Sequence, residues 1–405
     1  MGAGTSAASP GPVLVIPGGA FQVDLIRKAR SRGYHVICAD QRADCPGAAA
    51  ADEFHCIGLD RREGLLALAQ ARQVRGVLTD QTDSGVATAA WLSLQLGLAG
   101  IGTDAAALYT RKPLMRAFSL GAGFPTPPSR PCSDPAGAHR AAAELGYPVV
   151  VKPPAAQSSK GVARVANPAT LGSAFAAARR YSDDGTVLVE TYIDGPEYTV
   201  EGFRTAGGHR TLAISEKRHY ARCPMVACAL RYRPWYGEGQ LGHLERQHDR
   251  WVDSSGLALG MTHAEYRLMD GQFYLIEIAA RGGGSGIASA IVPWVSGIDY
   301  QEWLLDAVVE RRAVPRHERR AQRCALLEFL DLPDGVVQSV RGVEAARRVP
   351  GVCELEVGCV PGTPVRAPGD DTTRPGRFVL RADTDAELEQ SRRLLLAVLQ
   401  VSVTG

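Results

Sequence analysis

Apolar and polar segments alternate regularly over the first hundred residues. An apolar run at residues 12–17 (PVLVIP) predicts a short buried strand, and Gly18-Gly19 separates it from a predicted helix at residues 21–32. The alternation continues with strands at residues 34–40 and 76–79 and with helices at residues 61–73 and 84–96. Strands alternating with helices of this length predict an α/β unit, a parallel sheet covered on both faces. Because GGAFQ lacks the GxGxxG spacing, a structural turn is favoured there over a dinucleotide site.

The pattern changes after Arg111. We expect a helix starting near Lys112, another at residues 136–145, a strand at residues 147–152 and a return strand at residues 161–165. The loop between these two strands, at residues 153–160, is rich in small and polar residues and could lay backbone amides on phosphates. After a helix at residues 171–181, one strand ends at Glu190 and another opens at Glu197. The connector between them, residues 191–193, could hold an adenine edge and a ribose.

Residues 261–284 (MTHAEYRLMDGQFYLIEIAARGGG) predict a hairpin that turns at Asp270-Gly271. Each strand carries one interior carboxylate, Glu265 or Glu277. A three-residue loop would place the two carboxylates on the same face as diagonal neighbours, whereas a two-residue loop would place them on opposite faces. Two carboxylates on one face suit Mg²⁺, and Arg281, which follows the second strand, would then face the same phosphates.

The tail predicts a small α+β unit. A helix runs from Trp303 to about residue 312, and an arginine-rich stretch at residues 311–323 predicts a domain boundary. Strands follow at residues 324–330, 352–357 and 377–381, with a helix at residues 343–348. A final helix opens with Thr384 and Glu387 in capping-box spacing and should bury Leu388, Leu395 and Leu399.

Composition narrows the function. The 405 residues carry a formal charge of +2, which predicts no bulk attraction to nucleic acid or membrane. Nine scattered cysteines without a CxxC pair favour a reducing cytoplasm, and no apolar run is long enough to span a bilayer. Only five of 45 basic residues are lysines, so each lysine is a candidate for a role that needs a compact point charge. They are Lys28, Lys112, Lys152, Lys160 and Lys217.

Taken together, several short motifs carry a family resemblance. In order they are Lys112, Lys152-Pro, SSKGV, VETYIDGPEYTVEG, HAEY and LIEIAAR with trailing glycines. This series resembles the ATP-grasp superfamily, especially its carboxylate-amine ligase branch, which includes the L-amino-acid ligases. The resemblance implies a Rossmann-like N-terminal domain at residues 12–110, a two-lobed ATP-grasp domain at residues 111–312 and a C-terminal α+β domain at residues 322–405. It also implies a homodimer formed through the N-terminal domain.

The resemblance also implies roles for individual residues. Lys112 and Lys152 would contact the phosphates of ATP, and the loop with Ser158, Ser159 and Gly161 would close over them. Adenine would be held by Glu190 and by the backbone of Tyr192 and Ile193, and the ribose by Glu197. One or two Mg²⁺ ions, or Mn²⁺, would bind Glu265 and Glu277, and Arg281 would contact the transferred phosphoryl group. Ala279 stands where many members have a metal-binding Asn, which leaves the second ion short of one protein ligand.

The expected activity is ATP-dependent joining of a carboxylic acid, such as an amino acid, to an amine through an acyl phosphate. A carboxylase of the same superfamily is one alternative, although no biotin-carrier lysine motif appears in the chain. A nucleotide-binding regulatory protein without ligase activity is another. Substrate contacts are expected within residues 215–249, a stretch that includes Lys217, His219 and Trp235.

Overall fold

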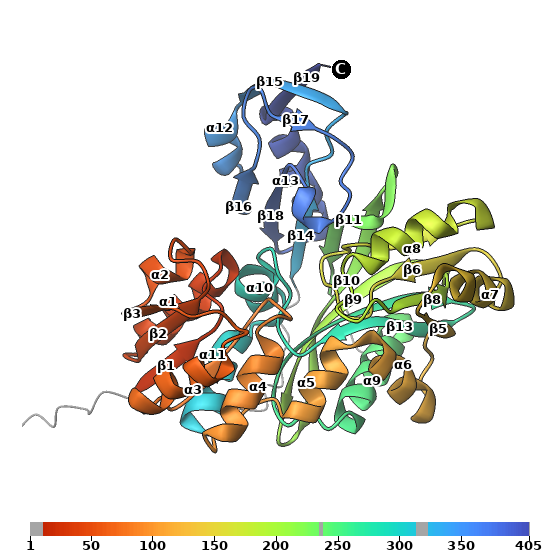
Figure 1. The fold of residues 1–405 in the computed structure, drawn as a ribbon. Coiled ribbons are helices and arrows are strands. Elements are labelled where there is room, and N and C mark those ends of the chain that lie inside the picture. Colours follow the sequence, from red (N-terminus) through yellow and green to blue (C-terminus); the bar gives the residue numbers. More distant parts are fainter. Residues whose placement is uncertain (1–10, 235–237, 313–322, 405) are drawn as a thin grey trace, which may run out of the picture.

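The computed structural model describes residues 11–234, 238–312 and 323–404 (Figure 1). Trp235 and most of the predicted boundary at residues 311–323 lie outside these ranges. The first unit is a parallel sheet with strand order β3-β2-β1-β4, which confirms the α/β prediction. Its elements are β1 (Pro12–Val15), α1 (Val23–Ser31), β2 (His35–Asp40), α2 (Pro46–Ala50), β3 (Glu53–Cys56), α3 (Arg62–Ala71), β4 (Val77–Leu78) and α4 (Val86–Gln95).

The second unit is a small antiparallel sheet with strand order β5-β8-β6-β7. Two helices, α5 (Thr103–Thr110) and α6 (Lys112–Gly121), lead into it. Two further helices, α7 and α8, pack on the sheet and share one apolar core with it. The elements of this core are β5 (Ser129–Cys132), α7 (Pro135–Leu145), β6 (Val149–Lys152), β7 (Ala163–Val165), α8 (Leu171–Arg179) and β8 (Val187–Thr191).

The third unit is an eight-stranded sheet with strand order β13-β12-β9-β10-β11-β14-β18-β16. Its first five strands belong to the middle of the chain, and α9 shares a core with them. These elements are β9 (Glu197–Thr205), β10 (Gly208–Tyr220), β11 (Cys223–Tyr232), α9 (Gly239–Ser254), β12 (Gly260–Met269) and β13 (Gln272–Ala279). The long strands β10 and β11 and the helix α9 occupy the stretch whose pattern predicted no clear element.

The C-terminal strands continue this sheet instead of forming a sheet of their own. β14 (Cys324–Phe329) pairs with β11, and β18 (Gly376–Ala382) and β16 (Val352–Val357) follow it. The tail also contains α12 (Val343–Arg347), α13 (Asp385–Val398) and a three-stranded sheet of β17 (Pro364–Val365), β15 (Gly335–Arg341) and β19 (Gln400–Thr404). The predicted capping box at Thr384 is confirmed, as is burial of Leu388, Leu395 and Leu399.

The central hairpin corrects one prediction. Its loop has two residues, Asp270 and Gly271, both at positive φ, and Met269 pairs with Gln272. A two-residue loop alone would send the two glutamates to opposite faces, but a bulge at Ile276 shifts the register by one residue. Glu265 therefore pairs directly with Glu277. Of the two loops considered, the hairpin has the two-residue one, yet the two carboxylates share a face.

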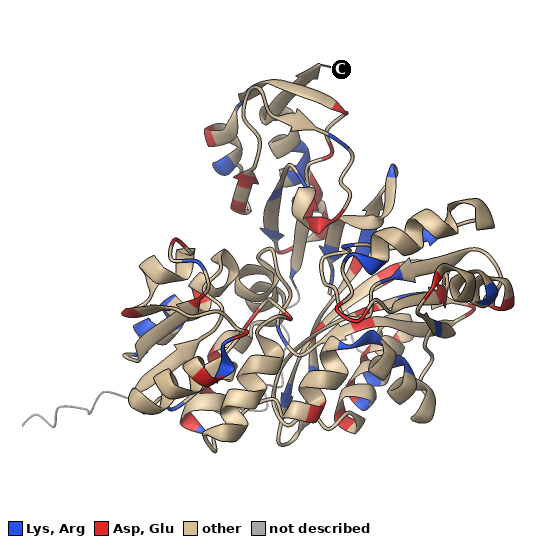
Figure 2. Ribbon diagram, in the orientation of Figure 1, with Lys and Arg blue, Asp and Glu red and all other residues tan. Residues whose placement is uncertain are grey.

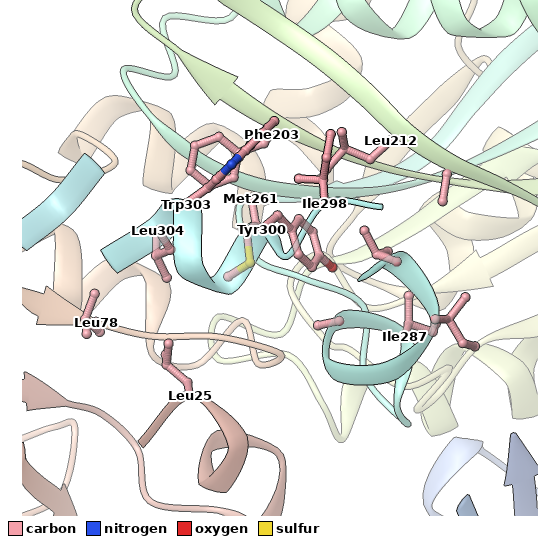
Figure 3. Packing of buried hydrophobic residues seen from close by; sticks show 14 of the residues in the cluster. Leu25, Leu78, Phe203, Leu212, Met261, Ile287, Ile298, Tyr300, Trp303 and Leu304 are labelled. Atoms are coloured by element: carbon pink, nitrogen blue, oxygen red, sulfur yellow. The ribbon is translucent and has the colours of Figure 1, made fainter. Parts of the chain in front are cut away.

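One apolar cluster joins the first unit to the large sheet (Figure 3). Leu25 of α1 and Leu78 of β4 belong to it together with Phe203 of β9 and Met261 of β12. Between them lie α10 (Val292–Ser296) and α11 (Tyr300–Leu305), and a π-helical turn, Asp306–Glu310, follows where the sequence predicted one continuous helix. Trp303 packs edge-on against Phe203, with ring centroids 5.6 Å apart. The shared core fixes the first unit against the sheet that carries the two glutamates.

Candidate active site

A cavity of about 690 Å³ lies where the units meet. All the predicted site residues except Gly161 line it, and so do four of the five lysines, Lys112, Lys152, Lys160 and Lys217. The cavity also takes residues from the first unit, such as Phe21 and Gln81, and from the C-terminal strands. The predicted site residues, which are scattered over 170 positions of sequence from Lys112 to Arg281, therefore converge on one space.

Lys152 belongs to a buried charged triad. Its Nζ lies 2.6 Å from Oε2 of Glu190, and Arg116 binds the same carboxylate with two hydrogen bonds of 2.9 and 3.1 Å. All three side chains are at most 5% exposed. Burial, aided by the neighbouring cations, lowers the pKa of Lys152 to about 8. Because both oxygens of Glu190 are engaged, this residue positions Lys152 at the cavity wall.

Lys112 reaches the cavity from the first turn of α6. Its Nζ lies 2.7 Å from Oε1 of Glu277 and donates to the carbonyl oxygen of Ala156 at 2.8 Å. Arg116 stands one helical turn further along and donates to the carbonyl oxygens of Leu275 and Ile276. The sequence analysis missed Arg116, although its spacing of four residues from Lys112 places both side chains on one face of the helix.

The loop between β6 and β7 lies against the cavity with unusual backbone geometry. Ser158, Ser159 and Gly161 all have positive φ. A Cβ at Gly161 would lie 2.8 Å from the ring of Tyr181 and 3.1 Å from Cα of Ala178, so only glycine lets the loop cross α8 here. The Gln157 side chain accepts from the Asp83 amide at 2.9 Å, and the Asp371 amide donates to the Ser158 carbonyl at 3.1 Å. Both the first unit and the C-terminal part hold this loop.

The connector before β9 is fixed by Arg267. This side chain donates to the carbonyl oxygen of Ile193 at 3.1 Å and to Glu197 at 2.6 Å, and it lies over the ring of Tyr192 at 4.9 Å. Glu197 also lies 2.7 Å from Lys217. Burial alone would raise the pKa of Glu197, but these cations hold it well below the ordinary value. Glu197 is therefore an anion at neutral pH.

Glu265 and Glu277 face each other across β12 and β13. Lys217 lies 2.7 Å from Glu265, and, against the effect of burial, this cation lowers the pKa of Glu265 to about 2. Two paired carboxylates at a cavity wall are oxygen donors of the kind that Mg²⁺ binds together with phosphate oxygens and water. Within the described residues no group of three or more His, Cys, Asp or Glu side chains forms a complete metal site. The donor set fits an ion that is shared with a phosphate ligand.

Arg281 is oriented by a residue of the first unit. Its Nε donates to Oδ1 of Asp83 at 2.7 Å, and this carboxylate raises the pKa of Arg281, although burial opposes the rise. Nearby, the fully buried Glu201 binds Nδ1 of His263 and, again against burial, raises the pKa of His263 to about 9. Asp83 lies outside the motifs that carry the resemblance, and Glu201 lies within VETYIDGPEYTVEG but was given no role.

Charged residues of both signs occur throughout the structure (Figure 2). Lys and Arg alternate with Asp and Glu along the ribbon, so neither sign dominates a unit (Figure 2). No helix in the described part of the chain is long and apolar enough to cross a bilayer.

Two separate stretches of the chain match known domain families. Residues 145–289 match the ATP-grasp domain family, and residues 328–404 match the family of L-amino acid ligase C-terminal domain 2. The chain therefore carries an ATP-grasp domain followed by a domain of the L-amino acid ligase C-terminal type.

Individual relatives show how far the likeness extends. The D-alanine–D-alanine ligase of Alcanivorax borkumensis is 39% identical over 118 residues, which are 29% of this chain and 36% of that protein. The chain thus matches only about a third of that relative's length.

Two solved structures share the fold over nearly the whole chain. The L-amino acid ligase from Bacillus licheniformis has a TM-score of 0.80 at 20% identity and covers 98% of this chain and 99% of its own. The biotin carboxylase domain of Hydrogenobacter thermophilus 2-oxoglutarate carboxylase, solved with magnesium ADP and bicarbonate, has a TM-score of 0.74 at 18% identity. It covers 98% of this chain and 91% of its own.

Proposed function

We propose that this protein is an ATP-dependent ligase that joins a carboxylic acid to an amine, with release of ADP and phosphate. The observation that carries the proposal is the charge arrangement at one end of the cavity. There Glu277 pairs with Glu265 and is bound by Lys112. Such an arrangement suits the transfer of a terminal phosphoryl group, because this reaction depends on positioning and charge neutralisation.

Except for Glu190 and Arg116, the roles that we propose for the side chains come from the family resemblance, and the lining of one cavity by all the predicted site residues except Gly161 supports them. Lys112 and Lys152 bind phosphate oxygens, and the loop with Ser158, Ser159 and Gly161 covers them. Tyr192 and Ile193 hold the adenine, Glu197 holds the ribose, and Glu190 with Arg116 holds Lys152 in place. Glu265 and Glu277 hold Mg²⁺, which neutralises phosphate charge when it is bound.

Two chemical steps complete the reaction. An oxygen of the carboxylate attacks the γ-phosphorus, the bond to the bridging oxygen breaks, and ADP leaves with the electron pair. The amine nitrogen then attacks the acyl carbon, the bond to the phosphate oxygen breaks, and the amine loses its extra proton to solvent. Arg281 faces the phosphoryl group during transfer. No nucleophile from the protein is needed.

Amino acids are the first substrates to test, because the Bacillus licheniformis protein with the same fold is named for them. The cytoplasmic location is proposed from the nine scattered cysteines, and the homodimer from the resemblance alone. Bicarbonate should be included as the acid, since a carboxylase shares the fold. If bicarbonate supports phosphate release from ATP and no other acid does, the carboxylase is favoured.

Labelled oxygen tests the chemistry. With a carboxylic acid carrying ¹⁸O, the label should appear in inorganic phosphate, because one acid oxygen leaves with the phosphoryl group. Release of pyrophosphate with label in AMP would show that the acid is adenylated and would refute the proposal. ATP turnover that no acid and amine stimulate would favour a regulatory nucleotide-binding protein.

A further inference from the structure

The C-terminal strands give the cavity an apolar wall. Leu230 of β11 pairs with Leu327 of β14, so the two side chains share a face, and Phe329 lies two residues further along on that face. All three are at most 5% exposed, and all line the cavity together with Met225 and Ala227. This wall exists because β14 continues the large sheet.

Arg374 lies over this wall. Its guanidinium carbon is 3.7 Å from the centroid of the Phe329 ring, and its side chain is only 9% exposed. Nη2 binds Oδ1 of Asp371 at 2.5 Å, whereas Nε is buried and has no partner among the described residues. Burial lowers the pKa of Arg374 in spite of Asp371 and raises the pKa of Asp371 in spite of Arg374. The two side chains thus form a pair of opposite charges at the cavity wall.

Arg374 lines the cavity, and a guanidinium at a cavity wall is suited to bind an anion. A phosphate group of ATP is the weaker candidate, because Asp371 beside Arg374 would repel a polyanion and because Lys112 and Lys152 already serve the phosphates. A zwitterion suits the neutral Asp371–Arg374 pair better, and an apolar group beside it would lie on Phe329, Leu327 and Leu230. These features together match an α-amino acid with an apolar side chain.

The reacting carboxylate is a different group. A carboxylate held by a guanidinium fork has its oxygens engaged in hydrogen bonds and is a poor nucleophile, whereas the acid that attacks ATP needs a free oxygen. An amino acid bound at Arg374 therefore takes part through its amino group.

We propose that Arg374 binds the carboxylate of the amine substrate, an apolar α-amino acid whose side chain packs on Leu230, Leu327 and Phe329. The assignment rests on the proposed ligase function and deepens it, because it makes the C-terminal strands the part that selects the amine.

Binding measurements test the assignment without turnover. L-Phenylalanine, L-phenylalaninamide and glycine are titrated by calorimetry into the full-length protein with Mg²⁺ and a non-hydrolysable ATP analogue. The native protein should bind phenylalanine roughly 10- to 100-fold more tightly than its amide, the range expected for a hydrogen bond between charged groups. It should also bind phenylalanine more tightly than glycine. Arg374→Met should bind phenylalanine and its amide equally, and Arg374→Lys should lie between the two proteins.

Methionine keeps an apolar contact with the Phe329 ring, and thermal unfolding of the variant checks that it folds. Arg366→Met is the matched control, since Arg366 is exposed on the same C-terminal part and does not line the cavity. It should retain the preference for the free carboxylate.

Three results would overturn the assignment. In the first, Arg374→Met still prefers phenylalanine to its amide. In the second, Arg374→Met loses affinity for the ATP analogue and not for phenylalanine, and in the third the native protein binds none of the three amines. Phosphate release with other acid and amine pairs would leave the ligase function standing in each case.

Discussion

Replacing Arg116 with methionine should damage both stability and activity, because this side chain joins two parts of the candidate site. Arg116 binds Glu190, the partner of Lys152, with hydrogen bonds of 2.9 and 3.1 Å. It also donates to the carbonyl oxygens of Leu275 and Ile276, at 3.1 and 2.6 Å. Ile276 is the bulge residue that brings Glu277 opposite Glu265. The variant therefore leaves a carboxylate with one cation and the bulge without its donor.

The size of the effect follows from burial. Removing one partner of a buried ion pair costs about 3–5 kcal/mol, because the remaining charge stays in a poorly solvated place. At about 2 °C per kcal/mol for a large domain, the unfolding temperature should fall by roughly 6–10 °C. Without Arg116, Lys152 would be the one cation left on Glu190 among the described residues. Lys152 would then be held more tightly by Glu190 and would be less available to the phosphates, so the KM for ATP should rise. The weakened bulge should also raise the Mg²⁺ concentration needed for half-maximal activity.

Thermal unfolding and ATP-dependent phosphate release at several Mg²⁺ concentrations measure these effects. Arg130→Met is the control, because Arg130 lies in β5 of the small sheet that carries Lys152 and Glu190, but it pairs with Glu144 at 3.6 Å and is about half exposed. Its unfolding free energy should change by less than about 0.5 kcal/mol. If Arg116→Met unfolds at the native temperature with native ATP and Mg²⁺ dependence, Arg116 does not position Lys152 or the bulge.

Two further substitutions test the metal and the lysines. Glu277→Gln should lower turnover by about 100-fold or more with the fold intact, because the amide is a weak Mg²⁺ ligand of nearly the same shape; native activity at ordinary Mg²⁺ would contradict the metal assignment. Lys152→Arg should weaken ATP use by about 10- to 100-fold, whereas Lys28→Arg, at a surface pair with Asp299, should change little; equal effects would refute the argument from lysine scarcity. With its pKa lowered to about 8, Lys152 loses its charge as the pH rises through that value, so kcat/KM for ATP should fall there, and a flat profile between pH 7 and 9 would contradict the assignment.

Local pattern predicted most elements of the first unit, although α2 (Pro46–Ala50) and β3 (Glu53–Cys56) were not predicted. The predicted strands are continuous apolar runs and the predicted helices bury one apolar face, and both patterns appear within about ten residues of sequence. The hairpin shows where local reasoning fails. Asp270-Gly271 correctly indicated a turn, but nothing in the strand sequence indicated the bulge at Ile276. The carbonyl oxygen of Ile276 accepts a hydrogen bond from Arg116, which lies 160 residues earlier, and the strand sequence itself cannot reveal such a contact.

Some residues of the candidate site could likewise be predicted from the sequence, and others could not. Lysine scarcity indicated residues that prove to be buried at the cavity, because the alternative surface roles had been taken by arginine. Asp83, Glu201 and Asp371 were given no role in the prediction. Asp83 binds Arg281 across two units, Glu201 binds His263 on the neighbouring strand β12, and the Asp371 amide donates to the Ser158 carbonyl. The significance of these three residues depends on pairing with residues that are distant in the sequence.

The sequence of the tail predicted a separate domain, whereas three of its strands continue the large sheet. The strands β14, β18 and β16 have ordinary lengths and turns between them, which is all that a local pattern records. Pairing of Leu230 with Leu327 instead places the C-terminal strands beside β11, at the cavity. The same loop that presents Arg374 also presents the Asp371 amide to the carbonyl of Ser158. One short segment thus contacts the proposed amine subsite and the loop over the phosphates, so the geometry of the two subsites is fixed together.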